Sequence, residues 1–403
     1  MENLIENKKK LESFSDLIYP IHTEDFNENY WEKKVLHIQR DNSDFFSSLF
    51  SLEDLDKILE YSRPRGGSLR VVKSQQPLNA SIYENQDGSL NLNQLYAAYA
   101  DGYTIVINEV QRFWDPIKAF IQNIRQQLGH NLVGNLYLTP ENEKALSPHY
   151  DAHDVFALQI SGEKHWILYD DDNYKTPLLN SFQPIFQREQ LTGAREITLK
   201  AGDIMYIPRG VPHEAYTTDK SSMHITFGVH PTQWVDFLTK SLTHLAQTNV
   251  ELRRALPIGF LHSKQELFSA DFELELMNIV QKMLTKENVE GALNIIEEEF
   301  RTKEQPKPDG HFAHLDKINR IDTQSYLQKR EGVESKVVNH FTGARIIFQG
   351  NTIKGPSQLA ATLEFISGQQ KAFQVKDIPF ISDENRLKLA KRLIRGGLLR
   401  IVE

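Results

Sequence analysis

The feature that most constrains the fold is a series of short β-strand patterns between residues 131 and 230. The segments are rich in branched and aromatic residues, and Gly, Pro and Asp separate them. They read NLVGNLYLTP, DVFALQISG, KHWILYD, REITLKAGDIMYIP and SMHITFGV. Five such segments, with tight turns and little helix between them, indicate a β-sandwich or a β-barrel.

Helical patterns lie on both sides of this region. Before it, Ser51 is the predicted N-cap of one helix, and Gly129 closes an amphipathic helix that begins near Trp114. The segment DGYTIVINEV predicts a strand between them. After Pro231, apolar residues recur every three to four positions from Trp234 to Leu245 and again from Leu276 to Leu284, which predicts two further helices.

The last part of the chain is predicted to be a small separate domain. A polar, proline-containing linker near residues 302–311 precedes it. Strand-like ARIIFQG is followed by helical SQLAATLEFIS and DENRLKLAKRLIRGG, and then by LLRIVE. This order of helix, glycine turn and strand suits a winged-helix-like unit.

Composition limits the class of protein. The 403 residues are 40% apolar and 25% charged, typical of a globular chain with two or three domains. The net charge of -8 argues against general nucleic-acid binding. The absence of cysteine excludes disulfides and thiolate-bound zinc. We see no signal peptide after Met1 and no apolar run of about 20 residues, so we expect a cytoplasmic protein without a membrane association.

A candidate metal site lies at the start of one predicted strand. In an extended chain the side chains of His149 and Asp151 point to the same side and can converge on one point. His213 follows in the restrained loop PRGVPH, and distant strand ends can meet at one mouth of a barrel. Two histidines and a carboxylate form the facial triad of non-haem Fe(II) oxygenases, but they would also suit a zinc hydrolase. The remaining alternative is three unrelated surface residues.

Lys164 is the candidate for binding an anionic cosubstrate. It shares one strand face with Trp166 and Leu168, after a predicted Ser-Gly turn. A buried lysine needs a partner, and the distal carboxylate of 2-oxoglutarate would supply one. Tyr137 could add a hydroxyl to the same carboxylate. The alternatives are a solvent-exposed lysine and an ordinary barrel aromatic.

The segments NLYLTP, SPHYDAHDVFALQISGEKHW and GDIMYIPRGVPHEA, in this order, resemble the JmjC-type ribosomal oxygenases. The resemblance covers residues from about 90 to 235 and extends to the rest only by layout. It implies a double-stranded β-helix core of the cupin/JmjC jelly-roll type within a mixed α+β chain. It also implies Fe(II), and 2-oxoglutarate as cosubstrate.

The resemblance assigns roles to individual residues. It implies iron at His149, Asp151 and His213, and the distal carboxylate of 2-oxoglutarate at Lys164 with help from Tyr137. Asn135, Thr226 and His224 are implied to line the pocket. Some members of the family use arginine where this chain has Lys164, and either cation serves a carboxylate.

Other polar residues are weaker candidates. His153 could reach a substrate groove or could be a partly exposed neighbour of the site. His165 is expected to face away from Lys164, and His230 to cap the turn into the helical segment. Arg112 could meet an acidic group of a substrate or lie in an exposed loop.

The resulting hypothesis is a dioxygenase that hydroxylates an amino-acid side chain of a protein substrate, expected to be ribosomal. The expected domains are N-terminal elements at 1–90, a catalytic core at 91–235, a helical dimerisation region at 236–305 that forms a homodimer, and a winged-helix-like domain at 306–403. Two alternatives stay open. One is the same chemistry on a small molecule or peptide natural product, and the other is a metal-binding cupin module without turnover.

Overall fold

The computed structural model describes residues 11–64, 67–170, 186–256, 258–262, 270–304, 306, 308–340 and 343–402. The chain divides into two compact units, Met1–Pro231 and Thr232–Glu403. In the described ranges, no helix combines the length and the apolar character of a membrane span.

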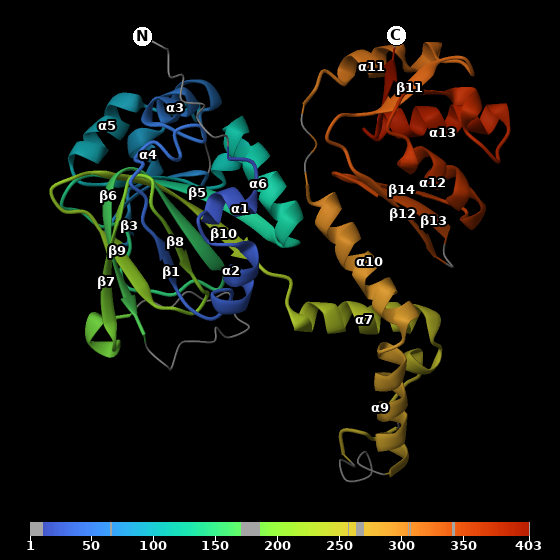
Figure 1. The fold of residues 1–403 in the computed structure, drawn as a ribbon, viewed down its shortest axis with the longest axis horizontal. Helices are drawn as coiled ribbons and strands as arrows, with labels where there is room; N and C mark the ends of the chain where they lie inside the picture. The colour runs from blue at the N-terminus through green and yellow to red at the C-terminus, as the bar shows by residue number, and fades with distance from the viewer. Residues whose placement is uncertain are drawn as a thin grey trace. The chain divides into compact units, whose positions relative to one another are not determined.

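The first unit, coloured blue to yellow-green in Figure 1, surrounds strands with short helices. Its helices are α1 (Phe14–Ile18), α2 (Thr23–Asn29), α3 (Leu52–Lys57), α4 (Ala80–Tyr83), α5 (Leu92–Ala100) and α6 (Asp115–Leu128). Its strands are β1 (Leu36–Ile38), β2 (Leu69–Lys73), β3 (Gln76–Pro77), β4 (Thr104–Ile107), β5 (Asn131–Thr139), β6 (Asp154–Tyr169), β7 (Ala194–Lys200), β8 (Ile204–Ile207), β9 (His213–Tyr216) and β10 (Ser222–His230). The prediction of a mixed α+β fold is confirmed.

These strands form one large antiparallel sheet that bends at β6. The order of the main path is β1-β8-β6-β10-β5-β4-β2-β3, and β7 and β9 both pair with β6. The first half of β6 lies between β8 and β10, whereas Glu163–Tyr169 lie between β7 and β9. Because β6 pairs with all four of these strands, it fixes the register of β8 and β10 relative to that of β7 and β9.

The first half of β6 is buried on both faces, in two separate apolar clusters. Phe156 and Leu158 face a large cluster that includes α1, α2 and α6, where the Phe156 ring lies 5.8 Å from Phe14 and 5.7 Å from Phe26. Val155 and Ala157 face a smaller cluster with Trp166, Leu168, Leu199, Met205 and Ile207. Burial on two sides explains why the strand reads as a nearly continuous apolar run. Each large side chain buried there contributes about 1.5–3 kcal/mol.

The local signals at the helix ends are confirmed. The Ser51 side chain accepts a hydrogen bond from the backbone N–H of Asp54 and so caps α3. Gly129 ends α6 with φ of 69°, a left-handed conformation that an L side chain rarely adopts.

One prediction about the strands was wrong. We expected a Ser-Gly turn between DVFALQISG and KHWILYD, but β6 runs through both as one strand of 16 residues. Gly162 takes φ of 66° inside it, and a side chain there would collide with the carbonyl of Ser221, so the glycine permits a bend without a break. The segment REITLKAGDIMYIP forms two strands, β7 and β8, because the Ala201–Asp203 segment turns.

The second unit contains helices followed by two small sheets. Its helices are α7 (Trp234–Thr248), α9 (Ala270–Met283), α10 (Lys286–Thr302), α11 (Phe312–Lys317), α12 (Ala360–Gly368) and α13 (Asp383–Arg395). Its strands are β11 (Tyr326–Lys329), β12 (Ser335–His340), β13 (Gly343–Phe348), β14 (Asn351–Gly355), β15 (Phe373–Gln374) and β16 (Leu399–Val402). One sheet has the order β15-β11-β16 and the other β12-β13-β14. Their shared apolar core includes Leu327, Phe348, Leu363 and Leu393.

Candidate metal centre

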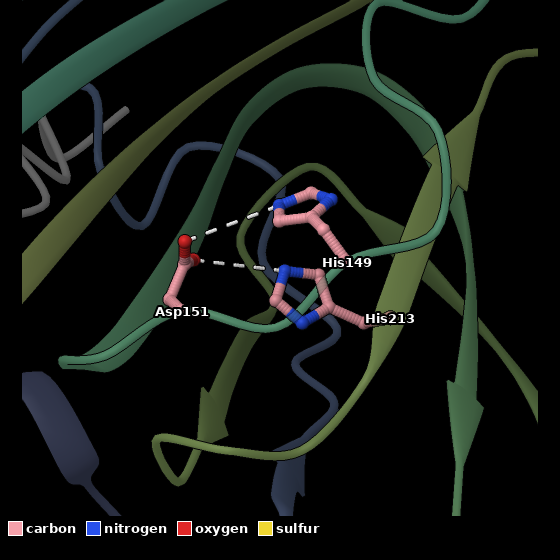
Figure 2. A group of neighbouring side chains, drawn as sticks. All are labelled: His149, Asp151 and His213. Carbon is pink, nitrogen blue, oxygen red and sulfur yellow. Dashed lines mark ion pairs between the residues drawn. The ribbon is translucent and has the colours of Figure 1, made fainter. Parts of the chain in front are cut away.

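Three predicted ligands meet in the first unit. The Nε2 atom of His149 lies 4.0 Å from Oδ1 of Asp151, and Nε2 of His213 lies 3.7 Å from Oδ2 of the same carboxylate. One donor atom from each residue falls within 4.8 Å of the others, a spacing that fits a single metal ion between them. Figure 2 shows both imidazole rings directed at the carboxylate. Both histidines are 5% exposed, so the donors lie inside the fold.

Backbone hydrogen bonds hold the two histidines beside each other. His149 and His213 each donate their N–H to the other's carbonyl, at 3.0 and 2.7 Å. The N–H of Gly210 donates to the carbonyl of Asp151 at 2.9 Å, which ties the loop before His213 to the third ligand. The positions of the ligands therefore follow from strand pairing and do not need a bound ion.

The Nδ1 atom of each imidazole already makes a hydrogen bond within the protein. Nδ1 of His149 lies 2.7 Å from the carbonyl of Ser147, and Nδ1 of His213 lies 3.0 Å from the carbonyl of Val211. A carbonyl only accepts, so Nδ1 carries the proton and Nε2 presents its lone pair to the centre. Neutral imidazoles with a fixed tautomer are the form that binds a metal.

The surroundings of His213 and Asp151 favour the deprotonated form of each side chain. Burial and the neighbouring His149 lower the pKa of His213. Burial acts to raise the pKa of Asp151, but His213, His149, His153 and His230 outweigh it, so that the pKa is lowered overall. With Nδ1 of both histidines facing a carbonyl, the centre offers two Nε2 lone pairs and the carboxylate of Asp151. This donor set fits a divalent ion of the Fe(II) type and leaves positions open for other ligands.

A buried ion-pair network that the sequence did not suggest supports the loop behind the ligands. Asp154, fully buried, accepts hydrogen bonds from the Arg209 guanidinium at 2.9 Å, the Arg209 backbone at 3.2 Å and the Tyr206 hydroxyl at 2.9 Å. Arg209 also pairs with Glu32. The network joins the start of β6 to the loop that carries His213. Arg209 stands in the PRGVPH motif, but its partner could be identified only in three dimensions.

Lys164 is buried beside this centre. It is 2% exposed, and its Nζ donates to Oγ1 of Thr139 at 2.9 Å. Within the described residues no carboxylate pairs with it, and burial lowers its pKa to about 7. Thr139 in turn lies 3.2 Å from Thr104. A cation in this position lacks a negative partner, so a carboxylate ligand fits the space.

Aromatic rings line the interior between the metal ligands and the strand that carries Tyr137. The Trp166 ring lies 5.9 Å from His213 and 5.6 Å from His224, and His224 stacks on Tyr137 at 4.9 Å. The nitrogens Nε1 of Trp166 and Nδ1 of His224 are buried without a partner in the described structure. Unpaired polar atoms in a buried wall indicate that a polar ligand completes it.

The other predicted pocket residues lie on the same face. Thr226 is opposite Asn135, and His224 is opposite Tyr137, across β10 and β5. The Tyr137 and Thr226 side chains are hydrogen-bonded, and burial raises the pKa of Tyr137 to about 12. Asn135 accepts from the Glu109 N–H at 3.0 Å. The sequence did not identify Thr139, the direct partner of Lys164, although it ends the same NLYLT strand.

The structure also places three of the weaker candidates, His165, Arg112 and His230. His165 faces away from Lys164 as predicted, contacting Thr198 at 3.0 Å. Arg112 is exposed and pairs with Glu109 at 2.7 Å. The prediction for His230 was wrong: Gln233 is the N-cap of α7, whereas His230 stacks on His153 at 4.8 Å.

Comparison with known proteins gives a consistent result. The family model of the JmjC domain matches residues 107–237. The chain is 30% identical to the bifunctional lysine-specific demethylase and histidyl-hydroxylase NO66 of Aedes aegypti over 306 residues, 72% of this chain and 48% of that protein. It is 25% identical to ribosomal oxygenase 2 of Mus musculus over 433 residues, 96% of this chain and 91% of that protein.

The chain thus spans about half the length of the NO66 proteins it matches and nearly all of ribosomal oxygenase 2. Among solved structures, E. coli ycfD aligns with a TM-score of 0.53 and 16% identity over 95% of this chain and 99% of that chain. At this identity the likeness shows the fold alone.

The geometry predicts that each ligand is needed for metal affinity. We expect His213→Ala and Asp151→Asn each to weaken Mn(II) binding by about 100-fold or more, because the first removes a donor atom and the second removes the negative charge of the site. Binding can be measured from the EPR signal of free Mn(II). His165→Ala, which alters a histidine on the other face of β6, should bind Mn(II) like the unaltered protein. Retained affinity in His213→Ala would contradict the proposed centre.

Proposed function

We propose that this chain, a JmjC-domain protein related to the ribosomal oxygenases, is an Fe(II)- and 2-oxoglutarate-dependent oxygenase. Its proposed reaction is the hydroxylation of a side chain of a ribosomal protein. The single observation that carries this proposal is the buried Lys164 ammonium without a carboxylate partner, on the same face of the fold as the His149–Asp151–His213 triad. A simple metal-binding module has no use for such a cation, whereas a dicarboxylate cosubstrate needs one.

Separate groups of residues would bind the metal and the cosubstrate. His149, Asp151 and His213 would hold Fe(II) through two neutral nitrogens and one carboxylate oxygen. Lys164 and the hydroxyls of Thr139 and Tyr137 would bind the distal carboxylate of 2-oxoglutarate. With both groups bound, 2-oxoglutarate and dioxygen are converted to succinate and carbon dioxide while one oxygen atom enters a C–H bond of the substrate. The apolar wall of Val155, Ala157 and Trp166 excludes water from the reaction.

Names of relatives support the choice of substrate. One relative is named as a bifunctional lysine-specific demethylase and histidyl-hydroxylase, and ribosomal oxygenase 2 of Mus musculus matches nearly the whole chain. We therefore propose a ribosomal protein as substrate and hydroxylation as the reaction.

Turnover without substrate tests the proposal directly. Purified protein with Fe(II), ascorbate and 2-oxoglutarate should release succinate, measured by NMR. His149→Ala should abolish the release, and Lys164→Met should raise the KM for 2-oxoglutarate by at least about 30-fold, because loss of one partner of a buried charge pair costs about 2–5 kcal/mol. Lys220→Met removes an exposed lysine, paired with Glu163 at 3.0 Å, and serves as the matched control. Metal binding without any succinate release would instead favour a non-catalytic module.

The lowered pKa of Lys164 predicts proton uptake when 2-oxoglutarate binds. With a pKa of about 7, Lys164 is mostly neutral at pH 8 in the free protein. A bound carboxylate favours the charged form, so binding should take up about 0.9 proton at pH 8 and almost none at pH 6. Affinity for 2-oxoglutarate should therefore fall as the pH rises above 7.

Calorimetry of the Mn(II)-loaded protein in buffers of different ionisation enthalpy measures this uptake. Lys164→Arg is the control, because arginine stays charged and should show no pH-dependent uptake at this position. Equal proton uptake in the two proteins would contradict the role of Lys164.

We further propose that the helical region forms a homodimer. Large apolar side chains are exposed along α7 and α9 and directly after α9: Trp234, Val235, Leu238, Leu242, Leu274, Leu276, Met277, Val280 and Leu284. Trp234 is 81% and Leu284 73% exposed. Contiguous apolar surface of this kind is typical of a protein interface, and the helices resemble in layout the dimerisation region of the ribosomal oxygenases.

A pair of substitutions on α9 tests the dimer. Leu276→Asp with Val280→Asp should convert a dimer to a monomer in light scattering coupled to size exclusion, because both place charge in an apolar interface. Asn278→Asp with Gln281→Asp adds the same charge at exposed polar positions of α9 and should leave the dimer intact. A monomeric unaltered protein would show that α9 does not serve this purpose.

The C-terminal unit is proposed to be winged-helix-like. Helix α13 ends at Gly396–Gly397, and β16 follows at once and pairs with β11, the order that the sequence suggested. Because the chain is acidic overall, we propose that this unit contacts protein and not nucleic acid.

A further inference from the structure

A buried carboxylate directly behind the metal ligands has no role in the chemistry described so far. Glu214 follows His213 in β9, and alternation along a strand sends its side chain to the face opposite the ligand. It is 1% exposed. Its oxygens accept two hydrogen bonds from the Arg188 guanidinium, at 2.5 and 2.9 Å, and one from the Tyr169 hydroxyl at 2.7 Å. Forked, charge-assisted pairs of this kind are strong and fix the orientation of both groups.

Tyr169, the last residue of β6, holds the chain on both sides of His213. Its backbone N–H donates to the carbonyl of Pro212 at 2.9 Å, and its hydroxyl donates to the Glu214 carboxylate. Leu168 is opposite His213 in the same pairing of strands. The position of this ligand therefore depends on how firmly Tyr169 and Glu214 are held in turn.

The segment of residues 186–191 makes equivalent contacts on both sides of His149. The N–H of Phe186 donates to the carbonyl of Pro148 at 2.8 Å, and the Phe186 ring lies 6.1 Å from that of Tyr150. Both rings are buried. The small apolar cluster around them also contains Ile167, Tyr169 and Leu191. Segment 186–191 thus covers the chain around this ligand from behind.

Arg188 joins these two sets of contacts, because it lies in segment 186–191 and binds the carboxylate of Glu214. Its own side chain is 52% exposed, whereas its partner is buried. Without Arg188, the carboxylate would keep one neutral donor, the Tyr169 hydroxyl, and a lysine at 3.9 Å, Lys144. An incompletely paired buried charge favours a movement that brings it to water, and here that movement would displace β9.

We propose that Arg188 and Glu214 are positioning residues that hold His149 and His213 at the separation required by a single metal ion. The inference rests on the metal site of the proposed oxygenase function. Neither residue touches the metal. Glu214 acts through the backbone of His213, and Arg188 acts through segment 186–191, which contacts both chain neighbours of His149. The hydrogen bonds between the two histidines set their register, whereas the ion pair limits the movement of the paired segments.

Arg188→Met tests the proposal, because it removes the charge and the forked hydrogen bonds but keeps an extended side chain. The dissociation constant for Mn(II), measured from the EPR signal of free Mn(II), should rise about tenfold, at the lower end of the effect of residues that orient metal ligands. The visible absorption bands of the Co(II)-loaded protein should shift, since they depend on ligand geometry. Arg188→Lys keeps the charge without the fork and should restore part of the affinity.

Glu214→Gln is an independent second variant of nearly the same shape, and it decides the matter if Arg188→Met fails to fold. It should also raise the dissociation constant for Mn(II). The double variant should be no worse than Arg188→Met alone, because both substitutions break one interaction. Additive effects would overturn the proposal. Arg301→Met, which removes an arginine bound to Glu297 and Glu334 in the second unit, is the matched control and should bind Mn(II) like the unaltered protein.

The melting temperature of the metal-free variants separates positioning from a purely structural role. A lower melting temperature with unchanged Mn(II) affinity and an unchanged Co(II) spectrum would show that the pair only stabilises the fold, and the proposal would be wrong. If the unaltered protein binds Mn(II) but releases no succinate, the oxygenase function fails, and the Mn(II) affinity of Arg188→Met still decides the positioning role. Absence of Mn(II) binding by the unaltered protein refutes the metal centre and this inference with it.

Discussion

The reciprocal backbone hydrogen bonds between His149 and His213 are the constraint on which the site depends. They pair the segment that precedes β6 with the first residue of β9 and bring both imidazoles to one point. Since main-chain pairing sets this register, the side chains are preorganised and only their rotamers need to be fixed. The carbonyls of Ser147 and Val211 fix them through Nδ1. The buried Asp154–Arg209 pair then anchors the loop that carries His213, so that the centre is supported from behind.

Strand β6 links the metal ligands to Lys164, the proposed binding residue for the cosubstrate. One half of the strand follows directly from Asp151 and His153, and the other half carries Lys164 and Trp166 on the interior face. Gly162 lets a single strand contribute to both ends of the pocket, although the register of β6 against β10 shifts between Met223 and His224. A substitution that shifted the register of β6 would therefore move the metal side and the carboxylate side together.

The buried Lys164 is the costliest feature of the site. A desolvated ammonium without a counter-charge opposes folding. The same desolvation lowers the pKa of Lys164. Thr139 offers only one neutral acceptor. In the same fold the partly buried Arg209 is paired with the carboxylates of Asp154 and Glu32, so an unpaired buried lysine is explained if a ligand brings the missing charge.

The sequence by itself determined the donor types, the spacing of His149 and Asp151 and the alternation that puts Lys164 with Trp166, because these follow from the period of an extended strand. Helix ends at Ser51 and Gly129 were equally readable, since caps depend on local conformation. Only the tertiary structure decided that β6 continues through Gly162, that Thr139 and Asp154 are the partners of Lys164 and Arg209, and that His230 stacks on His153. These contacts join residues that are distant in the chain, and their positions depend on how the sheet bends and closes, which no local pattern contains.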